Sequence, residues 1–507
     1  MRDSGSGILS MRGTSLVESR EDIRRVWDRI SALALDFIQN SGRLNGAVNQ
    51  VLADTVGTEL KLNAKPDLSK LGYSVEETTA FAKIVEERWR RWADKPAECD
   101  QRGKFTLHQM LDIALRWYIA YGEATGVISY MTPAERRVYG IETGVKVCMV
   151  TPTRLVRDTS EMEGMFAGVI HDTAGRPVAY RFLERQTGFE VKKNYPARDR
   201  DGRPRVIHAF DPVDAGDVRG ISVIAPALRT YAHSERLEEV TLATAILQTV
   251  FAASLTSPNP SADAFEALES LPDELKAEVS GYLQARFDLA AENKLTIGNA
   301  SQVNHLAPGE ELKFHTASTP GAQYVPFKAS LDRDMARAIG ITYEAYSMDF
   351  TGATYSSVRM GNSSIWPVVL RRRERIAAPI CQAIYENWLD EEIGEGRIAF
   401  RGGYPAFRAN RAAVTWAEWR GPAKPSADDH KSARAQTERL QNGTSTLEVE
   451  CAENGLDYRD VIQQRAAERK ACLDAGLPDP FLRVAGGGPA KDDEAEPAPA
   501  KREKADA

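Results

Sequence analysis

Residues 221–257 restrict the fold more than any other part of the sequence, because they have the pattern of one unusually long helix. Gly220 precedes the stretch, and a Ser-Pro-Asn-Pro sequence at 257–260 ends it. At 1.5 Å per residue such a helix would be on the order of 50 Å long. Its later apolar stripe comprises Leu237, Val240, Ala243, Leu247 and Val250. A rod of this length cannot bury its own stripe, so we expect neighbouring helices, including those of further copies of the chain, to cover it.

An acidic insert follows this helix and separates it from a second one. The insert is predicted at 258–325, and its part 261–295 contains eight acidic and three basic residues, a local charge of −5. The second helix is predicted at 326–341 and is closed by Gly340. Gly, Ser and Thr are frequent in the segment 342–357 beyond it, which is typical of a loop.

The first 220 residues have the pattern of an α+β lobe. Ser19 and Asp22 have the spacing of a capping box for a first helix, and residues 40–46 are expected to break it from a second helix. Further helices are predicted at 74–95 and 107–121. The β-rich runs lie at 127–130, 145–151, 166–170, 179–183 and 206–210, with turns at 172–175 and 199–202.

Another long helix is predicted at 356–392. It contains Pro367 and Pro379, so we expect it to be kinked. Residues 398–408 then have the pattern of short strands or loop.

The C-terminal region is predicted to contain two helices on either side of Gly455. Ser445 and Glu448 have capping-box spacing for the first, and Asp457 can cap the second. Residues 485–507 consist of Gly, Pro, Ala and charged residues without aromatic side chains, which is the composition of a disordered tail.

The composition indicates a globular protein. The chain has 507 residues, of which 42% are hydrophobic and 27% charged, with a net charge of −7. So acidic a chain is not expected to hold duplex DNA over its whole surface, because phosphate binding needs clustered Lys and Arg. Five dispersed cysteines without a C-x-x-C pair indicate free thiols rather than a metal site. With no signal peptide or long apolar stretch, we expect a soluble intracellular protein.

No residue pattern indicates catalysis, a cofactor or a metal ion. P-loop, G-x-S-x-G and H-E-x-x-H motifs are absent. Asp332 and Asp334 are two residues apart on a helix, so they point in different directions and are interpreted as surface charges. His208 and Asp211 lie at the end of a strand without a nucleophile nearby, and we expect them to form a turn hydrogen bond.

Two other groups of residues have alternative interpretations. The run Arg371, Arg372, Arg373 and Arg375 could contact phosphate, or form a solvated or inter-subunit face with Glu374. The tryptophan pairs 89/92 and 416/419 could stack on bases, but anchoring a helix in a core or an interface is the commoner use.

Eight blocks of sequence, taken in order, resemble the lambda-type family of phage portal proteins. They include SGRLNGAVNQVLADTVGTELKL (41–62), WRRWADKPAECD (89–100), GEATGVISY (122–130), GRPVAYRFLER (175–185), VIHAFDPVDAGDVRGISVIAPAL (206–228), PGEELKF (308–314), ARAIGITYEAYSMDFTGATYSSVR (336–359) and TSTLEVECAENGLDYRDVIQQRAAE (444–468). Together the blocks cover roughly residues 20–475.

The resemblance implies a structural protein and not an enzyme. Portal proteins of this family form rings, typically of twelve subunits, at one capsid vertex, and double-stranded DNA passes through the ring in packaging and ejection. The implied partners are further copies of the chain, the terminase large subunit, head–tail connector or adaptor proteins, the major capsid protein and the scaffold. The implied location is the virion, reached from the host cytoplasm during assembly.

The resemblance also implies a multi-lobed α+β subunit. Its parts would be a wing at 1–220, a first stem helix at 221–257, a clip at 258–325, a second stem helix at 326–341, a tunnel loop at 342–355, a long wing helix at 356–395, a helical crown at 396–484 and the tail at 485–507.

Several residues acquire expected roles in this mapping. The tunnel-loop residues near passing DNA would be Ser347, Met348, Asp349, Phe350, Thr351 and Gly352. Ring packing on the first stem helix would involve Leu237, Val240 and Leu247. Contacts to phosphate or to a neighbouring subunit would involve Arg359, Arg371, Arg372 and Arg375. The loop has no Lys or Arg, so its contact with DNA should be steric or weakly polar.

Two alternatives remain open at this point. One is another head-morphogenesis or connector protein that assembles without a channel wide enough for B-DNA. The other is a metal-dependent DNA-processing enzyme, such as a nuclease, fused to a helical assembly domain. The second alternative would need a convergent carboxylate or histidine cluster, such as one built around Asp332 or Asp334.

Overall fold

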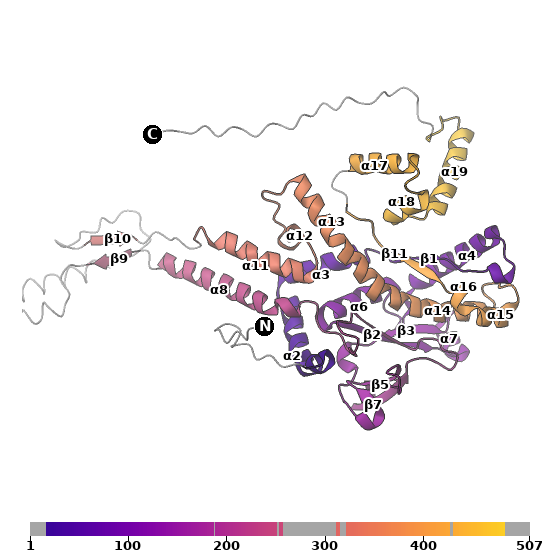
Figure 1. The fold of residues 1–507 in the computed structure, drawn as a ribbon, viewed down its shortest axis with the longest axis horizontal. Coiled ribbons are helices and arrows are strands. Elements are labelled where there is room, and N and C mark those ends of the chain that lie inside the picture. The colour runs from indigo at the N-terminus through magenta and orange to yellow at the C-terminus, as the bar shows by residue number, and fades with distance from the viewer. Residues whose placement is uncertain are drawn as a thin grey trace, which may run out of the picture. The chain divides into compact units, whose positions relative to one another are not determined.

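The computed structural model describes residues 17–186, 188–250, 253–256, 311–314, 321–425 and 429–481 (Figure 1). The chain divides into two compact units. The first comprises Met1–Leu52, Gln109–Tyr130 and Lys146–Ile384, and the second Ala53–His108, Met131–Val145 and Tyr385–Ala507. The tail predicted at 485–507 lies outside the described residues.

The two larger sheets of the first unit have three and four strands. A three-stranded sheet has the order β3-β2-β8, formed by Val145–Met149, Glu123–Tyr130 and Val206–Phe210. A four-stranded sheet has the order β4-β5-β6-β7, formed by Met165–Phe166, Val169–His171, Pro177–Gln186 and Phe189–Pro196. Val127, Val169, Tyr180, Phe182 and Val206 share one buried core. The predicted α+β class is therefore confirmed, although the exposed strand β7 was missed because it lacks buried residues.

Helices α2 (Ser19–Asn40) and α3 (Gly42–Thr55) are separated by a single residue. Ser41 ends the first helix, and its hydroxyl accepts a hydrogen bond from the Leu44 N–H at 3.1 Å, which caps the second. The predicted break over residues 40–46 is therefore too long. The predicted capping box at Ser19 is also wrong, because the N-cap is Glu18 and makes no side-chain cap.

Helix α6 spans Leu107–Tyr121, as predicted, and Gly122 follows with a positive φ of 86°. The next helix, α8, spans Leu228–Val250 and begins later than the predicted residue 221. Residues before it are held against α6: the Ser222 hydroxyl donates to the Ile119 carbonyl at 2.8 Å. Its end also differs from the prediction, because Ala253–Thr256 is strand β9.

Strand β9 pairs with β10 (Glu311–Phe314), and helix α11 (Tyr324–Ile339) follows. Helices α8 and α11 run side by side in opposite directions (Figure 1). Helix α13 (Tyr355–Arg372) continues through a π-helical turn, Arg373–Ala377, into α14 (Ala378–Gly394). The irregular turn lies just before Pro379, which cannot donate a backbone hydrogen bond.

The second unit is built around a cluster of aromatic side chains. Helix α4 (Val75–Ala93) begins with a capping box at Ser74 and supplies Trp89 and Trp92. Trp89 lies 5.3 Å from Trp388 and 5.6 Å from Trp419, ring centre to ring centre. The core interpretation of the 89/92 pair is confirmed. Trp416 is instead exposed, so the 416/419 pair is divided between surface and core.

The remaining elements of the second unit are short, apart from two C-terminal helices. Strand β1 (Lys61–Ala64) pairs with β11 (Ala417–Arg420). The helices are α5 (Pro96–Cys99), α7 (Pro133–Tyr139), α15 (Gly403–Ala409), α16 (Arg411–Val414), α17 (Asp429–Gln441), α18 (Leu447–Glu453) and α19 (Tyr458–Asp474).

Two local predictions for this unit require correction. Much of the predicted strand or loop at 398–408 is helix α15. The cap of α18 is Thr446, one residue later than the predicted Ser445, while Asp457 caps α19 as predicted, accepting from the Arg459 N–H at 2.7 Å.

Candidate channel and assembly site

A network of ion pairs fixes α8 against α11. The Lys328 ammonium lies 2.7 Å from a Glu238 carboxylate oxygen and 3.1 Å from Asp332. The Arg43 guanidinium, from α3, lies 3.2 Å from Glu238 and 3.3 Å from Asp332. Asp332 is only 4% exposed, so these two cations compensate the cost of burying its charge. The two helices that flank the insert are thereby held together within one chain.

This network corrects the prediction for the aspartate pair. Asp332 is buried and paired, and not a surface charge, whereas Asp334 is exposed as expected. The two carboxylates do not converge on a common site. Among the described residues, no group of three or more His, Cys, Asp or Glu side chains could hold a metal ion.

The apolar stripe of α8 is incompletely covered by its own chain. Leu237 is half-buried, Val240 is 55% exposed, and the neighbouring Leu242 is 63% exposed. The side chain of Leu247 lies outside the described part of the chain. Large apolar side chains left on a helix surface are typical of a protein–protein contact.

The segment after α11 is more ordered than a loop, which corrects the prediction for 342–355. Helix α12 (Tyr343–Ser347) begins at Thr342, whose hydroxyl accepts from the Ala345 N–H at 3.2 Å. Met348 ends this helix in the left-handed region, with φ 55°. Thr354 then opens α13 with a capping box. Hydrogen bonds at both ends therefore fix the backbone where the connecting residues leave α12 and where they enter α13.

The middle of this segment, 348–352, presents apolar side chains beside one carboxylate. Met348 is 74% exposed and Phe350 is 55% exposed. The Thr351 N–H donates to the Asp349 carboxylate at 2.9 Å. A hydrogen bond from the Thr351 side chain, together with this backbone bond, lowers the pKa of Asp349 below its usual value. The segment is thus anionic at neutral pH and lacks a cation that could bind phosphate.

The arginines of α13 and the following turn have different environments. Arg371 and Arg375 are half-exposed, and both pair with Asp211, at 2.9 Å and 2.8 Å. Arg372 is buried and donates to the Ile339 carbonyl at 2.8 Å, so it is unavailable to phosphate in this conformation. Arg359 is exposed. Of the four arginines proposed as contacts, three therefore remain at the surface.

A buried charge cluster lies where the chain leaves the sheet for α8. The Arg219 guanidinium donates to Glu123 of β2 at 2.8 Å, and His208 Nε2 lies 3.0 Å from the same carboxylate. Burial opposes ionisation of Glu123, but Arg219 and His208 outweigh it and lower the pKa of Glu123 to about 2. The predicted His208–Asp211 bond is therefore wrong. Sequence reasoning missed Glu123 because its partners are distant in the chain.

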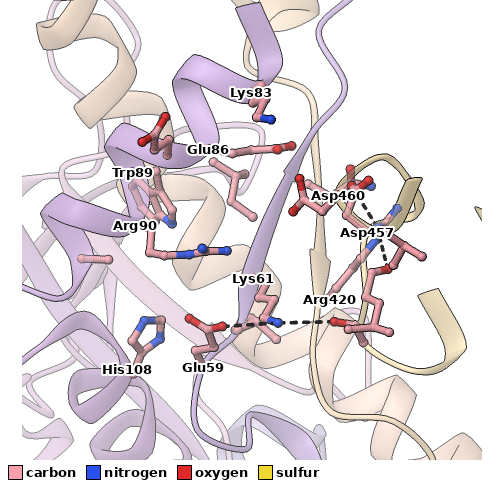
Figure 2. Close-up of a pocket in the computed structure, with 18 residues that line it drawn as sticks. Glu59, Lys61, Lys83, Glu86, Trp89, Arg90, His108, Arg420, Asp457 and Asp460 are labelled. Carbon is pink, nitrogen blue, oxygen red and sulfur yellow. Dashed lines mark hydrogen bonds and ion pairs between the residues drawn. The ribbon is translucent and has the colours of Figure 1, made fainter. Parts of the chain in front are cut away.

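A cavity of about 540 Å³ lies in the second unit (Figure 2). Its walls come from α4, the strands β1 and β11, and the chain from Gly455 to Val461. Glu86 of α4 accepts from the Ala64 N–H at 2.7 Å, and Arg420 lies 3.2 Å from Asp457. Burial, with Asp457 and Asp460 nearby, raises the pKa of Glu86 to about 7. No sequence motif indicated this cavity.

No helix in the described ranges is long and apolar enough to cross a membrane. A model of the family described as "Phage portal protein, lambda family" matches residues 9–373. The match covers well over half of the sequence and includes α8, α11, α12 and α13. The chain belongs to this family.

Curated relatives agree with this assignment to the lambda-family portal proteins. The chain is 26% identical over 466 residues to portal protein B of Escherichia phage lambda, covering 90% of this chain and 86% of the relative. It is also 26% identical over 468 residues to the portal protein of Escherichia phage N15, covering 90% and 87%. The predicted resemblance is confirmed.

The chain is also similar to solved structures. One is the neck of an empty gene transfer agent particle, with a TM-score of 0.45, 14% identity, and coverage of 88% of this chain and 94% of that one. Another is an HK97-family phage portal protein from Corynebacterium diphtheriae, with a TM-score of 0.32, 14% identity, and coverage of 71% and 90%.

The residue range of the family match distinguishes the ion-pair network and segment 342–354 from the cavity of the second unit. The ion-pair network and segment 342–354 lie inside the range of the family match. The cavity of the second unit draws part of its wall from residues 420 and 455–461, which lie beyond that range. The first region is therefore the candidate for the family's shared role.

Proposed function

We propose that this portal protein assembles into a ring of twelve copies and conducts double-stranded DNA into and out of a phage capsid without catalysing a reaction. In this proposal α8 and α11 form the stem, and segment 342–354 faces the channel. The anionic middle of that segment would repel phosphate, so DNA would slide past it instead of binding tightly.

One observation carries the proposal: large apolar side chains are exposed on the same elements that would form the stem and the channel. These side chains are Val240 and Leu242 of α8, Val325 and Phe327 of α11, Met348, Phe350, and Tyr355 and Met360 of α13. Meanwhile the ion-pair network holds α8 against α11, so the helix pair can present these side chains as a rigid unit. Because exposed apolar side chains recur along these elements, further copies of the chain are the simplest partner that could cover them.

The remaining assignments extend this proposal to the whole subunit. We assign residues 1–220 and the helix at 356–395 to the wing, 396–484 to the crown, and 258–325 to the clip, most of which lies outside the described residues. The clip would dock the terminase large subunit and later the head–tail connectors. Contacts with the capsid protein and scaffold would follow at the virion vertex, after assembly in the host cytoplasm.

Electron microscopy of the purified protein, combined with light-scattering mass, tests this function. The expected result is a ring with a central hole at least as wide as B-DNA and a mass near twelve times 56.0 kDa. A chain that stays monomeric at high concentration, with or without salt, would count against the proposal. A closed assembly without a through-channel would favour a connector that does not conduct DNA.

A further inference from the structure

The segment that joins α11 to α13 is held to the first unit by very few side chains. Of residues 342–364, which comprise α12 and the first half of α13, only Tyr346 is buried. This residue is 3% exposed, and the nearest buried residues on either side in the sequence are Ile341 and Ile365. Because burial of apolar surface is what holds a segment in place, the attachment of this segment is concentrated in Tyr346.

Tyr346 packs where three helices of the first unit meet. Its hydroxyl donates to Met335 Sδ of α11 at 3.7 Å, and Met335 itself is only 4% exposed. Met335 lines a small gap together with Leu44 of α3 and Tyr231 of α8. The Tyr346 side chain therefore reaches from α12 into the junction of α3, α8 and α11.

The hydroxyl end of Tyr346 also lies beside the ion-pair network that joins α8 to α11. Burial raises the pKa of Tyr346 most, the Asp332 carboxylate raises this pKa further, and the Arg43 guanidinium lowers it. The hydroxyl is therefore neutral at physiological pH and remains a hydrogen-bond donor. Because a thioether sulfur is only a weak acceptor, the packing of the ring contributes more to the attachment than the bond to Met335 does.

Hydrogen bonds extend the constraint from Tyr346 to the exposed residues after it. The Met348 N–H donates to the Glu344 carbonyl at 2.8 Å, at the end of α12. The Asp349 N–H then donates to the Ser347 hydroxyl at 3.2 Å. Both bonds reach back only a few residues, so the orientation that Tyr346 gives to α12 also sets the direction in which the next residues leave it.

A second contact between α12 and α11 is weaker. The Arg333 guanidinium carbon lies 4.6 Å from the centre of the Tyr343 ring. Arg333 is exposed and Tyr343 is half-buried, and a cation above an aromatic ring stabilises little where water also reaches it. Tyr343 and Tyr346 thus contact the same helix from neighbouring positions, but only Tyr346 does so in a buried position.

We propose that Tyr346 is the positioning residue of segment 342–354 and holds Met348 and Phe350 in a fixed place relative to α8 and α11. The inference rests on the function proposed above, because it concerns the segment that we assign to the channel. DNA then passes a fixed steric surface, whose position is set by the same helices that form the stem. Without Tyr346, a loop of variable position carries these exposed side chains.

Hydrogen–deuterium exchange of the full-length protein, followed by mass spectrometry, tests this role. Tyr346→Ala should raise the exchange rate of peptides covering 342–354 by at least about tenfold, because α12 then opens without breaking a buried contact. Peptides from the four-stranded sheet should change by less than about twofold, since they lie outside the opened segment. Tyr346→Phe keeps the ring and should exchange within about twofold of wild type. An unchanged rate in 342–354, or an equal increase throughout the first unit, would overturn the proposal.

Tyr343→Ala is the matched control, because it removes the same type of side chain from the same helix. It should raise exchange in this segment by less than about threefold, as expected for an exposed contact between a cation and a ring. If Tyr343→Ala loosened the segment as much as Tyr346→Ala, Tyr346 would not be the positioning residue. Should Tyr346→Ala fail to fold, Tyr346→Leu retains an apolar side chain and should still raise exchange at least about threefold. Exchange at the wild-type rate in Tyr346→Leu would likewise count against the proposal.

DNA retention separates this inference from the channel function. Particles with Tyr346→Ala rings should retain less full-length DNA than particles with Tyr346→Phe rings. If Tyr346→Ala loosens the segment but both particles retain DNA equally, Tyr346 holds the segment but the segment does not line the channel. Failure of the exchange test instead leaves the channel function standing and excludes only the role of Tyr346.

Discussion

Arg219 donates from Nε to both carboxylate oxygens of Glu123, 2.8 Å from each, although 96 residues separate the two in the sequence. Other guanidinium nitrogens reach the Ala167 and Pro152 carbonyls at 3.1 Å and 3.2 Å. Arg219 directly precedes Gly220, in the segment between the end of β8 and the start of α8. This buried pair therefore anchors the segment that leads to the helix that we assign to the stem.

Replacing the buried cation should destabilise the first unit strongly. Arg219→Met leaves the Glu123 carboxylate buried without its main partner, and we expect a loss of about 3–5 kcal/mol in the free energy of unfolding. The control is Arg185→Met, because that side chain is 76% exposed and should cost under about 0.5 kcal/mol. Chemical denaturation of both variants provides the measurement. Similar losses in the two would contradict the role assigned to Arg219.

Acid should weaken the same site. Because the pKa of Glu123 is lowered from 4.5 to about 2 on folding, its contribution is fully present above pH 4.5 and is lost as the pH falls toward 2. We therefore expect wild-type stability to fall more steeply than that of Glu123→Gln below pH 4.5. Unfolding curves over this range test the sign. If the stabilities of the two proteins fell in parallel over this pH range, the pKa of Glu123 would not be lowered on folding.

The junction before α8 should tolerate no side chain at position 220. A Cβ on Gly220 would lie 2.0 Å from the Gly122 carbonyl oxygen, so Gly220→Ala must displace the backbone. We expect a loss of at least about 1–3 kcal/mol, as in overpacked cores. Gly216→Ala is the matched control, because a Cβ there meets nothing within 4 Å. Thermal melts compare the two, and an unaffected Gly220→Ala protein would mean that the junction can relax.

A charge on the exposed stripe of α8 should prevent ring formation without unfolding the subunit. Val240→Asp and Leu242→Asp alter side chains that are more than half exposed within the chain, so the monomer should keep its stability. In a packed interface the same carboxylates would be buried unpaired, which is costly. Val138→Asp, on the similarly exposed α7, is the control. Native mass spectrometry measures the assembly state. Intact rings from both α8 variants would show that this face of α8 is not part of the ring interface.

Deleting residues 347–352 should leave assembly intact but impair DNA packaging or retention. The deletion removes the end of α12 together with Met348 and Phe350, while the capping of α13 by Thr354 remains. A Gly/Ser replacement of equal length tests whether the side chains or the chain length matter. Particles assembled with each ring are assayed for encapsidated full-length DNA. Normal packaging by rings that carry the deletion would contradict the assignment of this segment to the channel.

Local sequence patterns predicted the structure correctly where interactions between neighbouring residues determine it. Helix α6 and its terminating Gly122 were predicted to the residue, and the turns at 172–175 and 199–202 form as expected, with Gly175 and Gly202 donating back to Asp172 and Asp199. In each case the side-chain periodicity, or a glycine with positive φ, depends only on neighbours in the sequence.

Predictions failed where distant residues decide the outcome. Asp332 has the same local sequence features as Asp334, but Arg43 and Lys328 stabilise it in a buried position. His208 lies three residues from Asp211, yet its partner is Glu123 on the neighbouring strand, and Asp211 pairs with Arg371 and Arg375 instead. Strand pairing and helix packing bring these groups together, and neither is encoded in a short window of sequence.

Periodicity, capping and ordered motifs were enough to predict the α+β class, helices on either side of the acidic insert and the membership of the portal family, because these signals are local or cumulative. Which charges are buried and which arginines stay at the surface became clear only in the folded chain. Burial makes a charge depend on partners from distant segments, and only the folded chain brings those partners within reach.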